Sequence, residues 1–140
     1  MVRVFAFALF ALGLTGCVTP VPQASAPASC AKGDAMVETQ LFFGMSKPKG
    51  GTVSAAQWDA FVKRDVTPRF PEGFSVIDGA GFWLDGQTKR TISEKSKVIV
   101  RMHAGNAEAD QVISAIIDGY KAQFEQEAVL RVDRPVCATF

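Results

Sequence analysis

The sequence predicts an α+β domain in which an antiparallel sheet carries two helices on one face. Two observations lead to this prediction. Four stretches show strand-like patterning and two show the apolar spacing of helices. They follow one another in the order βαββαβ. That order is the split βαβ, or ferredoxin-like, pattern, in which the first and last strands are antiparallel neighbours in one sheet.

The first strand is predicted over residues 37–43, because its side chains alternate between two faces. One face carries Val37, Thr39, Leu41 and Phe43, and the other carries Glu38, Gln40 and Phe42. Gly44 then interrupts the strand pattern.

The first helix is predicted to begin at Ala55, where Ser54 and Gln57 form a capping box. Its end is expected at Thr67, because the residue before a proline, here Pro68, is disfavoured in the α conformation.

The second and third strands are predicted to form a hairpin. Residues 74–77 have strand character, residues 78–81 (DGAG) suggest a bulge or bend, and residues 82–84 resume the strand. The Asp-Gly pair at residues 85–86 is a strong hairpin-turn signal. The chain then returns over residues 89–103. At the end of this return, one face carries Val98, Val100 and Met102, and the other carries Ile99, Arg101 and His103.

The second helix is predicted to follow Asn106, a favourable N-cap residue. Its buried stripe is Val112, Ile113, Ile116, Ile117, Tyr120 and Phe124. The last strand is predicted over residues 128–132. Ala128, Leu130 and Val132 face one way, and Val129 and Arg131 face the other.

The N-terminal stretch has the features of an export signal. A short basic start is followed by an apolar run over residues 4–14, which is shorter than the roughly 20 residues needed to span a bilayer. The next residues, ending in Gly16 and Cys17, complete the quartet LTGC at 14–17. This quartet resembles the lipobox of bacterial lipoproteins, which implies lipidation of Cys17 and removal of residues 1–16. An ordinary secretory signal with a chance cysteine is the alternative.

The lipobox resemblance implies a bacterial cell-envelope protein attached to the membrane by its N-terminal lipid. Val18 would be the second mature residue, and because it is not aspartate, the outer membrane facing the periplasm is favoured. Residues 17–29 then form a tether rich in Pro, Ala and Ser, and residues 30–140 form a single globular domain. Without Arg3, basic and acidic residues are equal in number, so the composition argues against nucleic-acid binding.

Cys30 and Cys137 remain as a pair once Cys17 is assigned to the lipid. In an exported protein they are expected to form a disulfide, because the compartment is oxidising. The predicted topology supports this, since it brings the start of the first strand beside the end of the last. Two unpaired structural thiols or a redox pair are the alternatives.

Several short segments, taken in order and spacing, resemble an uncharacterised domain family of bacterial envelope lipoproteins. The segments are LFFG at 41–44, VTPRFP at 66–71, GFSVIDGAGFW at 73–83, ISEKSKV at 92–98, YKAQFEQEAVLRV at 120–132 and the Val-Cys pair at 136–137. The likeness covers about residues 30–140. Because that family has no known function, the resemblance implies the cellular address and no activity.

The sequence contains no recognisable reaction chemistry. His103 is the only histidine, and the cysteines lack zinc spacing, so neither a metal site, a cofactor nor a catalytic residue is predicted. Arg69 could bind a carboxylate ligand, but an ion pair with Asp65 or Glu72 is favoured.

One surface is a candidate for binding. If both helices cover one side, the opposite face is expected to carry Gln40, Phe42, Ile99, Arg101, His103 and Arg131, a mixed apolar and cationic patch. Within it, Phe42, Arg101, His103 and Arg131 are the candidate ligand-binding residues. Such patches often mark partner or ligand surfaces, and in other proteins of this architecture dimerisation closes the face.

The sequence therefore predicts a lipid-anchored, non-enzymatic module that binds a partner or small ligand through the open sheet face, with a homodimer as one arrangement. The alternative is a small-molecule enzyme of the dimeric α+β barrel type. In that case Arg101 and His103 would line a cavity between two sheets.

Overall fold

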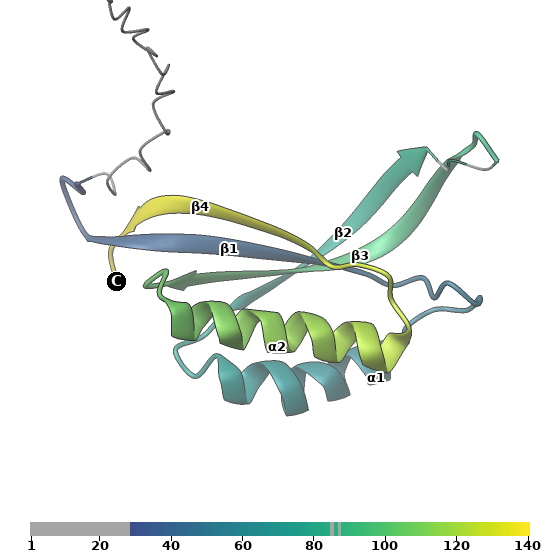
Figure 1. The fold of residues 1–140 in the computed structure, drawn as a ribbon, viewed down its shortest axis with the longest axis horizontal. Coiled ribbons are helices and arrows are strands. Elements are labelled where there is room, and N and C mark those ends of the chain that lie inside the picture. The colour runs from purple at the N-terminus through teal and green to yellow at the C-terminus, as the bar shows by residue number, and fades with distance from the viewer. Residues whose placement is uncertain (1–28, 85, 87) are drawn as a thin grey trace, which may run out of the picture.

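A computed structural model describes residues 29–84, 86 and 88–140. The predicted leader, Cys17 and most of the predicted tether lie outside the described residues. In the described part, the helices and strands follow the predicted order (Figure 1). They are β1 (Asp34–Gly44), α1 (Ala55–Phe61), β2 (Ser75–Leu84), β3 (Thr91–His103), α2 (Ala107–Phe124) and β4 (Leu130–Ala138).

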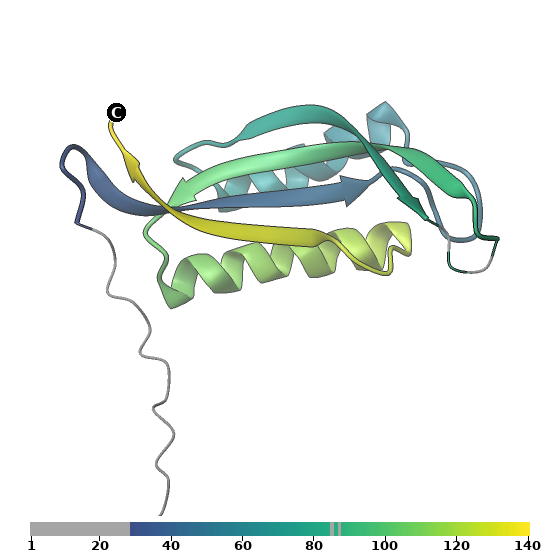
Figure 2. The ribbon, with the colours of Figure 1, turned by 90° about the horizontal axis from the view of Figure 1, so that it is seen from above.

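The four strands form one antiparallel sheet in the order β2-β3-β1-β4. Both helices lie on one face of this sheet and leave the other face open (Figures 1 and 2). The ferredoxin-like arrangement of the fold is therefore confirmed, including the antiparallel pairing of β1 with β4.

The buried face of β1 is the apolar face that its alternating pattern predicts. Leu41 and Phe43 are 1% and 0% exposed, and Thr39 on the same face is 1% exposed. β4 is longer than predicted and runs through Pro135 to Ala138. Pro135 is tolerated because β4 is an edge strand, where a missing N–H need not break a ladder hydrogen bond.

α1 begins as predicted but the chain leaves it differently. Gln57 N–H donates to Ser54 Oγ at 3.2 Å and Ser54 N–H donates to Gln57 Oε1 at 3.0 Å, so the capping box is present. The expected stop at Thr67 is wrong, because Thr67 keeps helical angles (φ −55°, ψ −44°). The helix widens into a π turn, η1 (Val62–Val66), and continues as a 3₁₀ turn, η2 (Thr67–Arg69).

β2 and β3 pair without interruption from Ser75 opposite Val100 to Leu84 opposite Thr91. The predicted bulge at residues 78–81 is therefore wrong. Gly79 has another reason to be glycine, since a Cβ there would lie 2.8 Å from Ser96 Oγ. The hairpin extends beyond the end of β1 and rises away from the helices (Figure 1).

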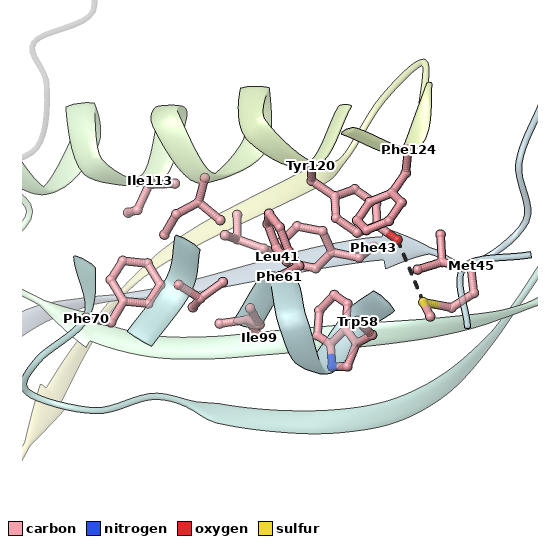
Figure 3. Packing of buried hydrophobic residues seen from close by; sticks show 13 residues of the cluster. Leu41, Phe43, Met45, Trp58, Phe61, Phe70, Ile99, Ile113, Tyr120 and Phe124 are labelled. Carbon is pink, nitrogen blue, oxygen red and sulfur yellow. Dashed lines mark hydrogen bonds between the residues drawn. The ribbon is translucent and has the colours of Figure 1, made fainter. Parts of the chain in front are cut away.

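The core lies between the sheet and the helices and is rich in aromatic rings (Figure 3). The Phe43 ring is 4.8 Å from Tyr120, 5.3 Å from Trp58 and 6.1 Å from Phe61, measured between centroids. Tyr120 Oη donates to the carbonyl of Gly44 at 2.8 Å, which fixes the end of β1 against α2. Burial raises the pKa of Tyr120.

Cys30 and Cys137 form a disulfide, with a Cα–Cα distance of 5.6 Å. The bond joins the segment before β1 to β4, as the pairing of Ala35 with Cys137 allows. It closes a loop that spans nearly all of the described chain, since the two cysteines are 107 residues apart.

Candidate functional site

The four candidate ligand-binding residues do not share one face. Phe42 lies opposite Val98 and Leu130, on the open face of the sheet. Arg101 and His103 instead belong to the face that the helices cover, as does Arg131. The prediction that all four form one open surface is therefore wrong.

The error concerns the phases of β3 and β4, that is, which of their residues face the helices. In β4, Arg131 pairs with the buried Leu41 and so lies on the helix side. Ile99 pairs with Leu41 and is 0% exposed, so Arg101 and His103, two and four residues later, also point to the helix side. Val98, Val100 and Met102 take the open face, which is consequently more apolar than predicted.

His103 is 4% exposed and takes part in a chain of hydrogen bonds. Its Nδ1 accepts from the backbone N–H of Gly105 at 3.1 Å, so this nitrogen carries no proton. Nε2 is therefore the protonated nitrogen and donates to Thr39 Oγ1 at 2.7 Å. Burial, together with the positive charge of Arg101, lowers the pKa of His103 and favours this neutral form.

The direction of these bonds argues against nucleophilic chemistry at Thr39. The Thr39 hydroxyl donates its proton to Asp133 Oδ1, not to His103. Burial tends to raise the pKa of Asp133, but hydrogen bonds from Thr39 and Arg131 lower it overall, so the carboxylate is charged. Thr39 is also only 1% exposed, so its hydroxyl is closed to a substrate, and the threonine orients its neighbours between an acceptor and a donor.

Arg131 ties this cluster to the second helix. Its Nη1 contacts Asp110 Oδ1 at 2.6 Å and its Nε contacts Asp133 Oδ2 at 2.9 Å. β4 and the first turn of α2 are thereby held together by charge-assisted hydrogen bonds, which are the stronger class.

Arg101 lies at the same end of the sheet and is largely buried. Its side chain is 11% exposed and its guanidinium lies 4.2 Å from the centre of the Phe70 ring. Nη1 reaches the carbonyl of Arg69 and Nη2 reaches Glu72 Oε2, both at 3.3 Å. Arg69 itself is paired with Asp65, 3.8 Å away, as the ion-pair interpretation predicts.

Three hollows are lined by Arg101, His103 or both. One of about 250 Å³ is lined by Arg69, Arg101, His103 and the start of α2. A second of about 380 Å³ lies between His103, Arg131 and α2. The third, of about 550 Å³, lies on the other side of Arg101, toward the open face.

Sequence patterns missed part of this cluster. The missed residues each contact one of the predicted arginines or His103, and they are Thr39, Glu72, Asp110 and Asp133. A signal existed for Asp133, which lies two residues after Arg131 and hence on the same face of the strand.

The described residues provide neither a metal cluster nor a membrane-spanning helix. Residues 29–84, 86 and 88–140 contain no group of three His, Cys, Asp or Glu side chains placed to hold a metal ion. In the same part of the chain, no helix combines the length and the apolar character needed to cross a membrane.

Comparison with known proteins identifies a family and a fold. The family model described as Protein of unknown function (DUF3574) matches residues 38–140. No curated protein matches the chain.

Solved structures with the same fold include a phage SAM lyase in two states. The complex with S-methyl-5'-thioadenosine is 14% identical, covers 79% of this chain and 97% of its own, and superposes with a TM-score of 0.54. The apo state is 16% identical, covers 82% and 98%, and has a TM-score of 0.52. At these identities the likeness concerns the fold alone.

Proposed function

Because this chain belongs to the DUF3574 family, whose function is unknown, we propose a role for it from the geometry of its surface. The protein is a lipid-anchored, non-enzymatic binding module of the bacterial cell envelope, held at the outer membrane facing the periplasm. Its open sheet face associates with a second copy of the chain.

The observation that carries this proposal is the apolar character of the open face. Ile77, Leu130 and Val132 lie on it and are 52%, 59% and 41% exposed. Trp83 and Ile92 continue the same face along the β2–β3 hairpin. Exposed apolar side chains gathered on one face of a sheet are typical of an association site.

The charges on this face also suit a second copy. Glu38 contacts Arg134 at 2.7 Å and accepts from Gln40 at 2.6 Å. These hydrogen bonds, first from Arg134 and then from Gln40, lower the pKa of Glu38 and keep the pair ionised and mutually neutralised. Two such pairs can therefore meet without net repulsion.

The open face, with the β2–β3 hairpin included, approaches the area that a dimer interface needs. Strands about 4.8 Å apart and roughly 25 Å long make a four-stranded face on the order of 500 Å² if the face is treated as flat. The projecting hairpin adds to it, which brings the surface toward the roughly 800 Å² that each partner contributes to a standard interface.

Photo-crosslinking in intact cells tests this association. With p-benzoylphenylalanine in place of Leu130, irradiation is expected to give a covalent species of twice the chain's mass. The same residue in place of Gln111, which is exposed on α2, serves as the matched control and should give none. Absence of a dimer from position 130, or equal dimer from both positions, contradicts the proposal.

The anchoring part of the proposal has its own test. Cys17→Ser removes the thiol that the lipobox resemblance marks for acylation, so the variant is expected to be unprocessed or to leave the membrane fraction. Radiolabelled palmitate incorporation, compared between wild type and variant, measures this. Equal labelling of both chains would contradict lipidation at Cys17.

A second candidate function is enzymatic. The dimeric-barrel version that placed Arg101 and His103 between two sheets is wrong, because both lie on the helix side. What favours an enzyme is the likeness to phage SAM lyase over nearly the whole length of that protein. Release of S-methyl-5'-thioadenosine from SAM by the purified chain would favour this candidate over a pure binding module.

A further inference from the structure

On one edge of the Arg101 guanidinium, only one of the two neighbouring nitrogens has a hydrogen-bond partner. The Nε and Nη2 nitrogens of a guanidinium point their N–H groups to the same side and can bind one carboxylate in parallel. Glu72 contacts Nη2 alone, at 3.3 Å. Nε is buried and has no hydrogen-bond partner among the described residues.

The contact with Glu72 is weak compared with other ion pairs of the same chain. Arg64, Arg131 and Arg134 are more exposed than Arg101 and contact carboxylates at 2.6–2.9 Å. Glu72 is itself 76% exposed. A charged group as buried as Arg101 costs free energy unless a close counter-charge and hydrogen bonds compensate it. A carboxylate better placed than that of Glu72 would therefore be stabilised here.

The sheet leaves room for such a ligand beside Arg101. β2 begins at Ser75, opposite Val100, so no strand pairs with the outer edge of β3 at Arg101. The hollow of about 550 Å³ lies at this place. Its walls are mainly apolar and include Met36, Phe74, Val100 and Met102, while Arg101 and Glu72 are its charged residues.

We propose that this hollow binds a small monocarboxylate with an apolar body, whose carboxylate displaces Glu72 and pairs with Nε and Nη2 of Arg101. The apolar body lies against Met36, Phe74 and Met102. A mostly apolar cavity with one orienting cation has the composition of a small-molecule site, and its volume is within the usual range of about 300–1,000 Å³. Methionine side chains adapt readily to different ligand shapes.

A single cation sets the charge of the ligand. Once Glu72 has moved away, Arg101 is the one charged side chain left among the residues that line this hollow. A monoanion is neutralised there, whereas a second carboxylate would be desolvated without a partner. Val100 and Met102 belong to the open face, so this site adjoins the surface proposed above for the second copy. The two proposals are tested separately, because one is read from ligand binding and the other from the mass of the assembled protein.

Nuclear magnetic resonance of the full chain in detergent tests the proposal with water-soluble probes. Butyrate is expected to shift the Arg101 Nε–H signal and the methyl signals of Met36 and Met102 saturably, while the buried Met45 methyl stays in place. Each buried methylene strengthens binding by about fourfold. Acetate, which is two methylenes shorter, should therefore half-saturate at a roughly sixteenfold higher concentration. 1-Butanol, which has no charge, should not shift Arg101 Nε–H.

Three variants separate binding from a structural role. Glu72→Gln removes the competing carboxylate and is expected to tighten butyrate binding several-fold. Arg101→Lys keeps the charge but loses the fork, and should weaken binding at least tenfold. Lys49→Gln removes a positive charge near the opposite end of α2, where Lys49 pairs with Glu125, and should change nothing.

Three outcomes would overturn the proposal. One is the absence of a saturable butyrate shift in the wild-type chain. Another is a chloride titration that shifts the same signals equally, since this would mean an ionic-strength effect. The third is unchanged or weaker butyrate binding in Glu72→Gln, which would mean that Glu72 does not occupy the carboxylate position.

Discussion

Phe43→Ala is expected to lower the free energy of unfolding by about 3–5 kcal/mol, the range for removing a fully buried aromatic side chain. Phe43 is 0% exposed, and its ring contacts the rings of Trp58, Phe61 and Tyr120 from both helices. The loss therefore opens a cavity that neither helix can fill alone. Equilibrium unfolding in urea measures the difference.

Phe42→Ala is the matched control, because the same ring is removed one residue away on the open face. Phe42 is only partly buried, so its loss is expected to cost about 1 kcal/mol. If Phe42→Ala proved as costly as Phe43→Ala, the assignment of the two faces of β1 would be wrong.

Loss of the disulfide is the second large expected effect. Cys137→Ser opens a loop of about 100 residues, for which the chain-entropy account gives a loss of about 4–5 kcal/mol. Unfolding in urea without reductant, with wild type and variant compared at the same pH, measures it.

Cys30→Ser and the double variant complete this test. Both should match Cys137→Ser, because removing either partner abolishes the same bond and the effects are not additive. A double variant that loses the sum of the two single effects would show that each cysteine stabilises the fold by separate contacts.

The order of the elements could be predicted from sequence because each one carries a local signal. Ser54 and Gln57 mark the start of α1, Asn106 marks the start of α2, and the alternation around Leu41 marks the buried face of β1. The Cys30–Cys137 bond follows from the topology, since β1 and β4 are neighbours.

The faces of β3 could not be predicted, because both of them contain apolar residues. The helix-side face also carries Arg101 and His103, which pattern rules assign to solvent. These residues are tolerated there because distant partners satisfy them: Phe70 stacks on the guanidinium, and Thr39 hydrogen-bonds the imidazole. Contacts between residues so far apart in the chain leave no local trace in the sequence.

The predicted helix end at Thr67 is wrong for a different, local reason. The steric rule for a residue before proline is a preference, and here the wider π turn places Thr67 N–H and its hydroxyl on the carbonyl of Val62. Pro68 then lies in the first turn of η2, where its missing N–H costs no hydrogen bond.

The central claim, that the open sheet face binds a second copy, is tested most directly by the mass of the full chain in density-matched detergent at sedimentation equilibrium. The proposal predicts a dimer for the wild-type chain and a monomer for Leu130→Glu, which places a charge at an exposed apolar position of the face, beside Phe42. Gln111→Glu, which places the same charge at an exposed position of α2, should remain dimeric. A monomeric wild-type chain, or a Leu130→Glu variant that stays dimeric, would contradict the claim.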